Sequence, residues 1–156
     1  MSINPMTALQ LATMNPLETD PSVMAVQLEL PEGVAVVSGT AELRITTETA
    51  TGEALDGQYP LVNTGDVWRV AEDAQVRMRA DIARVRGWEA ADPNGTNGSF
   101  SAGFAPCAVG GGPADNARFT MALQLEPGGA FLPLFDNVPL TRIYDAETVG
   151  LLQPCR

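Results

Sequence analysis

Alternating apolar and polar residues predict that most of this chain forms β-strands. In Thr40–Glu48, the odd-numbered positions from 41 to 47 hold Ala, Leu, Ile and Thr, while the even-numbered positions hold charged residues or Thr. This alternation, rich in Thr and β-branched residues, is typical of a strand with one buried face. The same pattern predicts strands over Val23–Leu30, Tyr59–Val62, Val67–Val70, Ser99–Phe104, Arg118–Glu126 and Phe131–Phe135, and a short first strand within residues 7–13.

The period of the apolar residues changes between positions 71 and 90. Apolar residues recur there every three or four positions, which places them along one side of a helix: Ala74, Met78, Ile82, Val85 and Trp88. The spacing of four residues between Asp73, Arg77 and Asp81 predicts ion pairs along that helix. A second, short helix is expected over Ala146–Leu152, with Asp145 as its N-cap.

Glycine and proline mark the connections between these elements. Pro127-Gly128-Gly129 predicts a hairpin between the last two strands, and Pro133 places the second of them at a sheet edge. We expect Asp56-Gly57 in a turn and residues 105–116 in a long loop. The order of the elements, strands followed by one long helix and then more strands, predicts an α+β fold. We expect an antiparallel β-sheet or small β-sandwich with the amphipathic helix of residues 71–90 packed on it. Residues 1–22 form an N-terminal segment, and residues 23–156 form a single domain.

The charged residues exclude several classes of function. The 156 residues include nine Arg, no Lys, no His and 19 acidic residues, so the net charge is −10. Without His there are no imidazole bases, Ser-His triads or His-ligated metals, and without Lys there is neither Schiff-base chemistry nor a P-loop. The acidity argues against nucleic acid or anionic lipid as the main partner. Glu42 and Glu48 share a strand face but stand about 20 Å apart, too far for a catalytic pair. We therefore expect no enzymatic activity and no cofactor.

The two cysteines, Cys107 and Cys155, both lie in stretches rich in Pro and Gly. This favours a disulfide that ties the C-terminus to the domain over two free thiols in a reducing cytosol. No stretch is long enough to span a membrane. Since cytosolic proteins seldom hold disulfides, we expect an exported protein, periplasmic or lipid-anchored to the envelope. On this interpretation, Met1 replaces an export sequence that has been removed. A lipid-bearing cysteine just before Ser2 is then the candidate anchor.

Two glycine-containing loops are candidate binding sites. The oxygen-rich loop Asp92–Gly98 makes Asp92 and Asn94 the calcium candidates, but Asn97 occupies the position where an EF-hand requires glycine. Two Asn-Gly turns between a helix and a strand are the preferred interpretation, and no metal is expected. Gly110-Gly111-Gly112 precedes a strand in a chain without Lys, so we interpret it as a flexible loop and not as a phosphate cradle.

Three aromatic residues are candidates for a surface that binds a protein or a small ligand. Trp68 precedes the long helix, and Phe131 and Phe135 bound the expected edge strand. Aromatic residues at such positions either pack in the core or present an apolar surface, and an open edge strand also permits strand addition.

Four segments together resemble small exported lipoproteins of unknown function from GC-rich Gram-negative bacteria. The resemblance rests on Gly87-Trp88-Glu89-Ala90-Ala91-Asp92-Pro93, Cys107, Phe131-Leu132-Pro133-Leu134 and Pro154-Cys155. It implies an envelope location and no defined activity.

The leading hypothesis for the function is a non-enzymatic exported binding or accessory domain of the bacterial envelope. The alternatives are a carboxylate-dependent hydrolase acting on envelope polysaccharide and a purely structural envelope component. Two or more carboxylates converging in one cleft favour the hydrolase, whereas an apolar patch favours the binding domain.

Overall fold

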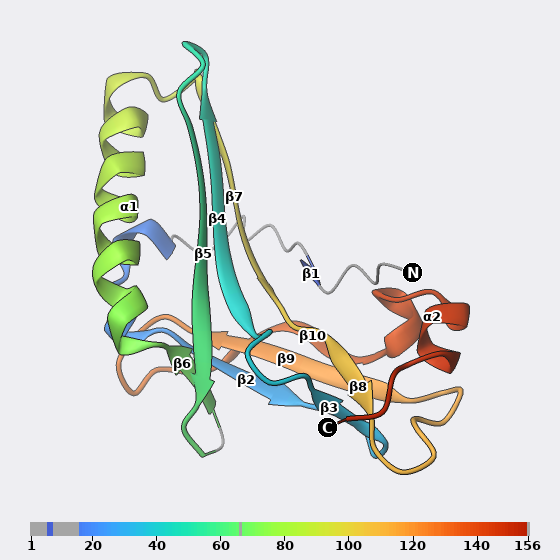
Figure 1. Cartoon of the computed structure of the whole chain (residues 1–156). Helices are drawn as coiled ribbons and strands as arrows, with labels where there is room; N and C mark the ends of the chain where they lie inside the picture. Colours follow the sequence, from blue (N-terminus) through green and yellow to red (C-terminus); the bar gives the residue numbers. More distant parts are fainter. Residues whose placement is uncertain (1–5, 8–15, 66, 156) are drawn as a thin grey trace.

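The computed structural model describes residues 6–7, 16–65 and 67–155 (Figure 1). Two helices, three 3-10 turns and ten strands follow one another within these residues. The strands are β1 (Met6–Thr7), β2 (Ala25–Glu29), β3 (Val34–Val36), β4 (Glu42–Thr49), β5 (Ala54–Asn63), β6 (Val67–Val70), β7 (Thr96–Gly103), β8 (Pro106–Ala108), β9 (Arg118–Gln124) and β10 (Leu132–Pro139). The helices are α1 (Glu72–Ala91) and α2 (Ala146–Gly150), and the 3-10 turns are η1 (Pro16–Glu18), η2 (Pro21–Val23) and η3 (Leu140–Arg142).

Eight of these strands form one antiparallel sheet in the order β1-β7-β4-β5-β6-β2-β9-β10, and β3 pairs with β8 in a small second sheet. The large sheet curls strongly. The long strands β7, β4 and β5 stand side by side next to α1, whereas β2, β9 and β10 run across their lower ends (Figure 1). The predicted α+β fold, an antiparallel sheet with one main helix packed on it, is confirmed.

The apolar core lies between α1 and the inner face of the sheet, defined here as the face that holds Leu43 and Tyr59. The predicted stripe of α1 is buried there from Ala74 to Val85, and Trp88 is half-buried. The inner face continues from strand to strand because paired residues point to the same side of a sheet. The alternation predicted for β4 is confirmed, since Leu43, Ile45 and Thr47 are each at most 5% exposed.

Tyr59 joins the sheet to α1. Its ring is fully buried, and its hydroxyl donates a hydrogen bond to Asp81 Oδ2 at 2.7 Å. Burial, followed by this hydrogen bond to a carboxylate, raises the pKa of Tyr59. The Arg77 guanidinium lies 5.4 Å from the centre of the same ring and donates to the Gln58 carbonyl oxygen. The predicted ion pairs from Arg77 to Asp73 and Asp81 are therefore wrong, because the sheet supplies better-placed partners for both Arg77 and Asp81.

Three further expectations are corrected by the structure. Asp56 and Gly57 lie within β5 and not in a turn, because β4 and β5 pair along almost their whole length. The expected loop of residues 105–116 begins with β8, which pairs with Val34–Val36. The last helix ends at Gly150, two residues earlier than predicted, with Asp145 capping it as expected through the Thr148 amide.

The hairpin of β9 and β10 and the edge position of β10 are confirmed. Of the predicted first strand, residue 7 lies in β1 and residues 8–13 lie outside the described residues. Neither helix in the described part of the chain has the length and hydropathy to cross a membrane.

Candidate functional site

Trp68 and Phe135, far apart in the sequence, lie on the same face of the sheet. Trp68 in β6 is paired with Val26 in β2, and Val26 is paired with Leu123 in β9. Phe135 in β10 is paired with Met121, two residues from Leu123. Because strand side chains alternate, all of these residues share the inner face. The strands that hold Trp68 and Phe135, β6 and β10, lie three strand spacings or about 14 Å apart.

Two leucines extend this arrangement into a strip. Leu28 is paired with Met121, and Leu132 is paired with Leu123, so both lie on the inner face as well. Leu132 is 45% exposed, whereas Trp68, Leu28 and Phe135 are half-buried and pack against the core. We call Trp68, Leu28, Leu132 and Phe135 the apolar strip.

The strip has a firm base. Val26, Met121 and Leu123, which are paired with its members on the same face, are each at most 3% exposed. The Phe135 ring lies 5.2 Å from the ring of buried Phe119, measured between centroids, and the two planes are tilted by 46°. Phe135 thus packs at a tilt against the buried Phe119 ring while it stays half-buried itself.

Phe131, the third aromatic candidate, is not placed in the strip. It precedes β10, is half-buried, and has no cross-strand partner in the sheet. Leu132 belongs to the apolar concentration of residues 131–135 that the sequence places on the expected edge strand, whereas sequence reasoning missed Leu28 as a surface residue. The alternation of residues 24–30 already placed Leu28 on an apolar side, but only strand pairing shows that this side continues to Trp68 and β10.

The free edge of β10 is poorly suited to strand addition. Pro133 has no amide hydrogen, and the pairing register of β10 shifts twice, between Pro133 and Phe135 and between Phe135 and Val138. Asn137 also has a φ of 51°, outside the extended region. Prolines and bulges of this kind protect edge strands from pairing with other chains. The apolar side chains, and not the backbone edge, are therefore the accessible feature of β10.

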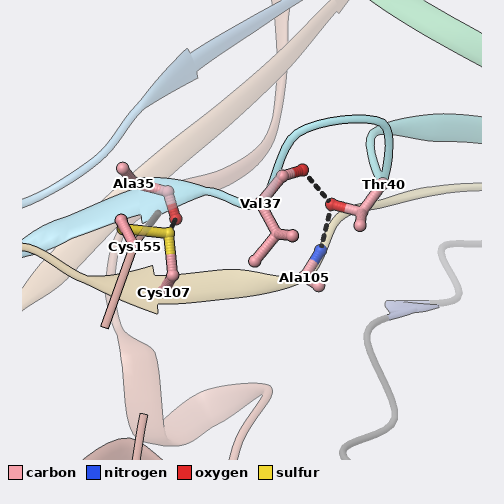
Figure 2. Close-up of a disulfide and its surroundings, with 6 residues drawn as sticks. All are labelled: Ala35, Val37, Thr40, Ala105, Cys107 and Cys155. Carbon is pink, nitrogen blue, oxygen red and sulfur yellow. Dashed lines mark hydrogen bonds between the residues drawn. A yellow bond between two sulfur atoms is a disulfide. The ribbon is translucent and has the colours of Figure 1, made fainter. Parts of the chain in front are cut away.

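Cys107 and Cys155 are positioned as a disulfide, with 2.04 Å between the sulfur atoms and 5.0 Å between the Cα atoms (Figure 2). Cys107 belongs to β8, and its sulfur lies 3.5 Å from the Ala35 carbonyl oxygen in β3. The C-terminal residues pair with β8, since the Cys155 amide donates to the Ala108 carbonyl oxygen at 2.9 Å. The predicted pairing of the cysteines agrees with this geometry, and an oxidising compartment stays a prediction.

Hydrogen bonds and a glycine contact brace the region around Cys107. The Thr40 hydroxyl accepts from the Ala105 amide at 3.0 Å and donates to the Val37 carbonyl oxygen at 2.7 Å (Figure 2). Gly33 has a φ of 91°, and a Cβ there would lie 2.2 Å from the Gly112 carbonyl oxygen. The glycine-rich loop therefore packs backbone against backbone on the turn before β3, which explains the need for glycine.

The first of the two expected Asn-Gly turns after α1, at Asn94-Gly95, is confirmed. The second is wrong, because Asn97 and Gly98 lie in β7, paired with β4. Asp92 Oδ1 accepts a hydrogen bond from the Gly95 amide at 3.1 Å, and the Thr96 hydroxyl donates to the Asp92 carbonyl oxygen at 2.9 Å. Asn94 is exposed. Across the described ranges, 6–7, 16–65 and 67–155, no three His, Cys, Asp or Glu side chains are grouped as a metal site.

A hollow of about 410 Å³ lies between η1 and the last turns of α1. Its lining includes two carboxylates, Glu18 and Glu89, with Arg86 beside them. All three side chains are exposed. The acid of a glycosidase lies in an apolar pocket, so exposure of both carboxylates counts against acid catalysis. The remaining lining residues are Leu17, Ala90 and Pro93.

Comparisons of the chain with protein-family models, with curated proteins and with solved structures find no match. The candidate sites are therefore interpreted from their own geometry.

Proposed function

We propose that the protein is a non-enzymatic binding domain, exported to the bacterial envelope, that holds a partner protein against the apolar strip. The observation that carries the proposal is the alignment of Trp68, Leu28, Phe135 and Leu132 on one face across four strands. Apolar side chains that pack on a buried core but remain partly accessible occur at protein-binding surfaces. Large aromatic residues dominate the binding energy of such surfaces, which favours Trp68 and Phe135 as anchors.

Export is supported by the paired cysteines. Cys107 is 3% exposed and the C-terminal residues pair along β8, so the disulfide is part of the folded structure. Structural disulfides persist mainly in oxidising compartments. Intact-mass analysis of untreated protein after alkylation tests this point: we expect no alkylated thiol without reductant, and two alkylated thiols in the untreated protein would contradict export.

An uncharged dye that fluoresces in apolar surroundings, Nile red, tests whether the strip is accessible. We expect the native protein to bind the dye and Leu132→Asp to weaken dye fluorescence severalfold. Val76→Asp is the matched control, because Val76 is 68% exposed on α1 and is not part of the strip. Equal losses in both variants, or no binding by the native protein, would contradict the proposal.

Photocrosslinking in the bacterial envelope then tests for the partner. A benzoylphenylalanine placed at position 132 should give one discrete product that Phe135→Ser abolishes, whereas the same probe at position 76 should not. Loss of the product in Phe135→Ser ties the crosslink to the strip and not to chance proximity. A product that is insensitive to Phe135→Ser would refute a role for the strip.

One observation bears on the alternative, a carboxylate-dependent hydrolase, which the exposure of Glu18 and Glu89 disfavours. Glu18 and Glu89 line the same hollow, as a hydrolase needs. Incubation with purified envelope polysaccharide tests it. A hydrolase should release reducing sugar ends, and Glu18→Gln and Glu89→Gln should each abolish that release. A binding domain should release none in any variant.

A further inference from the structure

A second hollow, of about 370 Å³, lies on the outer face of the sheet, the face opposite α1. Strand pairing explains its shape, because it spans three neighbouring strands, β5, β4 and β7. One wall is the row Asp56–Thr46–Ser99, and the other is the row Ala54–Glu48–Asn97. We call this hollow the polar trough.

The floor of the polar trough is backbone. Leu55, Thr47 and Gly98 form the row between the walls. Leu55 and Thr47 are at most 8% exposed, because their side chains point to the inner face, and Gly98 has no side chain. The walls stand about 7 Å apart along the strands, and the three strands make the trough about 10 Å long.

Polar oxygen atoms dominate the walls. The Thr46 and Ser99 hydroxyls are hydrogen-bonded to each other across β4 and β7. Asp56 is held in place by Arg44, whose Nε and Nη2 donate to the two carboxylate oxygens at 2.8 and 2.6 Å. This ion pair lowers the pKa of Asp56, so the carboxylate stays ionised and accepts hydrogen bonds. Glu48 and Asn97 are exposed and face each other on paired strands.

The chemistry of the walls restricts the ligand. Glu48 and Asp56 carry two negative charges and Arg44 one positive charge, so the local field disfavours phosphates, sulfates and uronic acids. Ala54 supplies the only apolar side chain of the walls, so an apolar ligand would leave polar groups unpaired. Carboxylate, amide and hydroxyl oxygens prefer a compact ligand with several O–H or N–H donors. Saccharides with neutral rings have this composition.

We propose that the polar trough binds a neutral saccharide unit, with the Asp56 and Glu48 carboxylates and the Asn97 amide as its hydrogen-bonding partners. This inference does not rest on the proposed function, because the trough and the apolar strip lie on opposite faces of the sheet. If both hold, the protein connects a polysaccharide on one face to a protein on the other.

Nuclear magnetic resonance titration of ¹⁵N-labelled protein tests the proposal directly. The neutral probes are N,N′-diacetylchitobiose and cellobiose, and the anionic probe is digalacturonic acid. We expect saturable shifts of the amide signals of residues 46–48 and 97–99 with at least one neutral probe. Binding of the anionic probe should be at least tenfold weaker. Absence of saturable shifts with both neutral probes, or equal binding of the anionic one, would overturn the proposal.

Two matched variants separate the trough from its surroundings. Asn97→Ala removes an exposed amide from the trough wall, and we expect it to weaken saccharide binding at least fivefold. Gln58→Ala removes an exposed amide from the same face of β5, beyond the Asp56 row, and should leave binding unchanged. Retained amide spectra show that both variants are folded. Equal effects of the two variants, or no effect of Asn97→Ala, would refute the role of the trough, and Leu132→Asp should not change saccharide binding.

Discussion

Replacing Gly57 by alanine should loosen the contact between the sheet and α1. Gly57 lies on the inner face of β5, two residues before Tyr59, and the Tyr59 ring leans back over it. A Cβ at position 57 would lie 1.9 Å from the Tyr59 hydroxyl oxygen and 2.4 Å from its Cζ. These distances are far below van der Waals contact, so the ring must move. Because Tyr59 is fully buried, it has no open space to move into.

The size of the effect follows from what the moving ring loses. Its hydrogen bond to the Asp81 carboxylate, 2.7 Å long, has a charged partner, and bonds of this kind contribute about 1.5–3 kcal/mol. Forcing an extra methyl group into a packed core costs about 1–3 kcal/mol more. We therefore expect Gly57→Ala to lower the free energy of unfolding by about 2.5–6 kcal/mol. That is a large part of the roughly 5–15 kcal/mol typical of small domains.

Urea unfolding followed by circular dichroism measures this loss. Tyr59→Phe removes only the hydrogen bond, so it should cost about 1.5–3 kcal/mol, less than Gly57→Ala. Gly87→Ala is the control, because a Cβ at that exposed position in α1 meets no atom within 4 Å. It should leave stability unchanged or raise it by up to about 1 kcal/mol. A Gly57→Ala protein within about 1 kcal/mol of wild type would refute the packing argument.

Three further predictions concern the disulfide, a strained turn and acid stability. Cys155→Ser removes the disulfide, which joins residues 48 positions apart, so chain entropy predicts that the free energy of unfolding in urea falls by about 4 kcal/mol. A fall of less than about 1 kcal/mol would contradict a structural disulfide. Gly33 (φ 91°) and Gly39 (φ 80°) share a backbone strain, but only a Cβ at Gly33 would clash with the glycine-rich loop. Gly33→Ala should therefore lower the free energy of unfolding clearly more than Gly39→Ala, and equal losses would rule out the contact between Gly33 and that loop. The hydrogen-bonded ion pair with Arg79 lowers the pKa of Asp20 below its ordinary value of 3.8. The pair therefore stabilises the fold fully above pH 3.8, and this stabilisation is lost as the pH falls from 3.8 through the lowered pKa. Asp20→Asn should flatten that part of the stability–pH curve, and an unchanged curve would contradict the ion pair.

A protein with both proposed surfaces would act as a connector. The apolar strip lies on the inner face at the β6–β10 end of the sheet, and the polar trough lies on the outer face of β5, β4 and β7. Because the curled sheet is a single hydrogen-bonded unit, it would hold the two surfaces in a defined orientation. The disulfide belongs to the small sheet of β3 and β8 and contains no residue of the apolar strip or the polar trough. It therefore stabilises the domain without taking part in either proposed contact.

Local patterns in the sequence determined most of the secondary structure. The period of apolar residues in a strand or a helix is a property of neighbouring positions, so β4, β9, the buried stripe of α1 and the β9–β10 hairpin could be predicted from it. The Asp145 cap and the edge position of β10 follow from single residues with strong local preferences. Gly57 shows where this reasoning fails. A glycine after Asp indicated a turn, whereas its real role is to leave room for the Tyr59 ring.

Tertiary structure alone decided which residues meet. The order of the strands places Trp68 and Phe135 on one face, although 66 residues of chain lie between them. Asp81 bonds to Tyr59 in the sheet in place of Arg77, one helical turn away, and Arg79 bonds to Asp20, 59 residues away in the sequence. Strand order and the curl of the sheet depend on contacts between distant segments, which no local period records. The elements could therefore be predicted from the sequence, whereas the surfaces they build together required the fold.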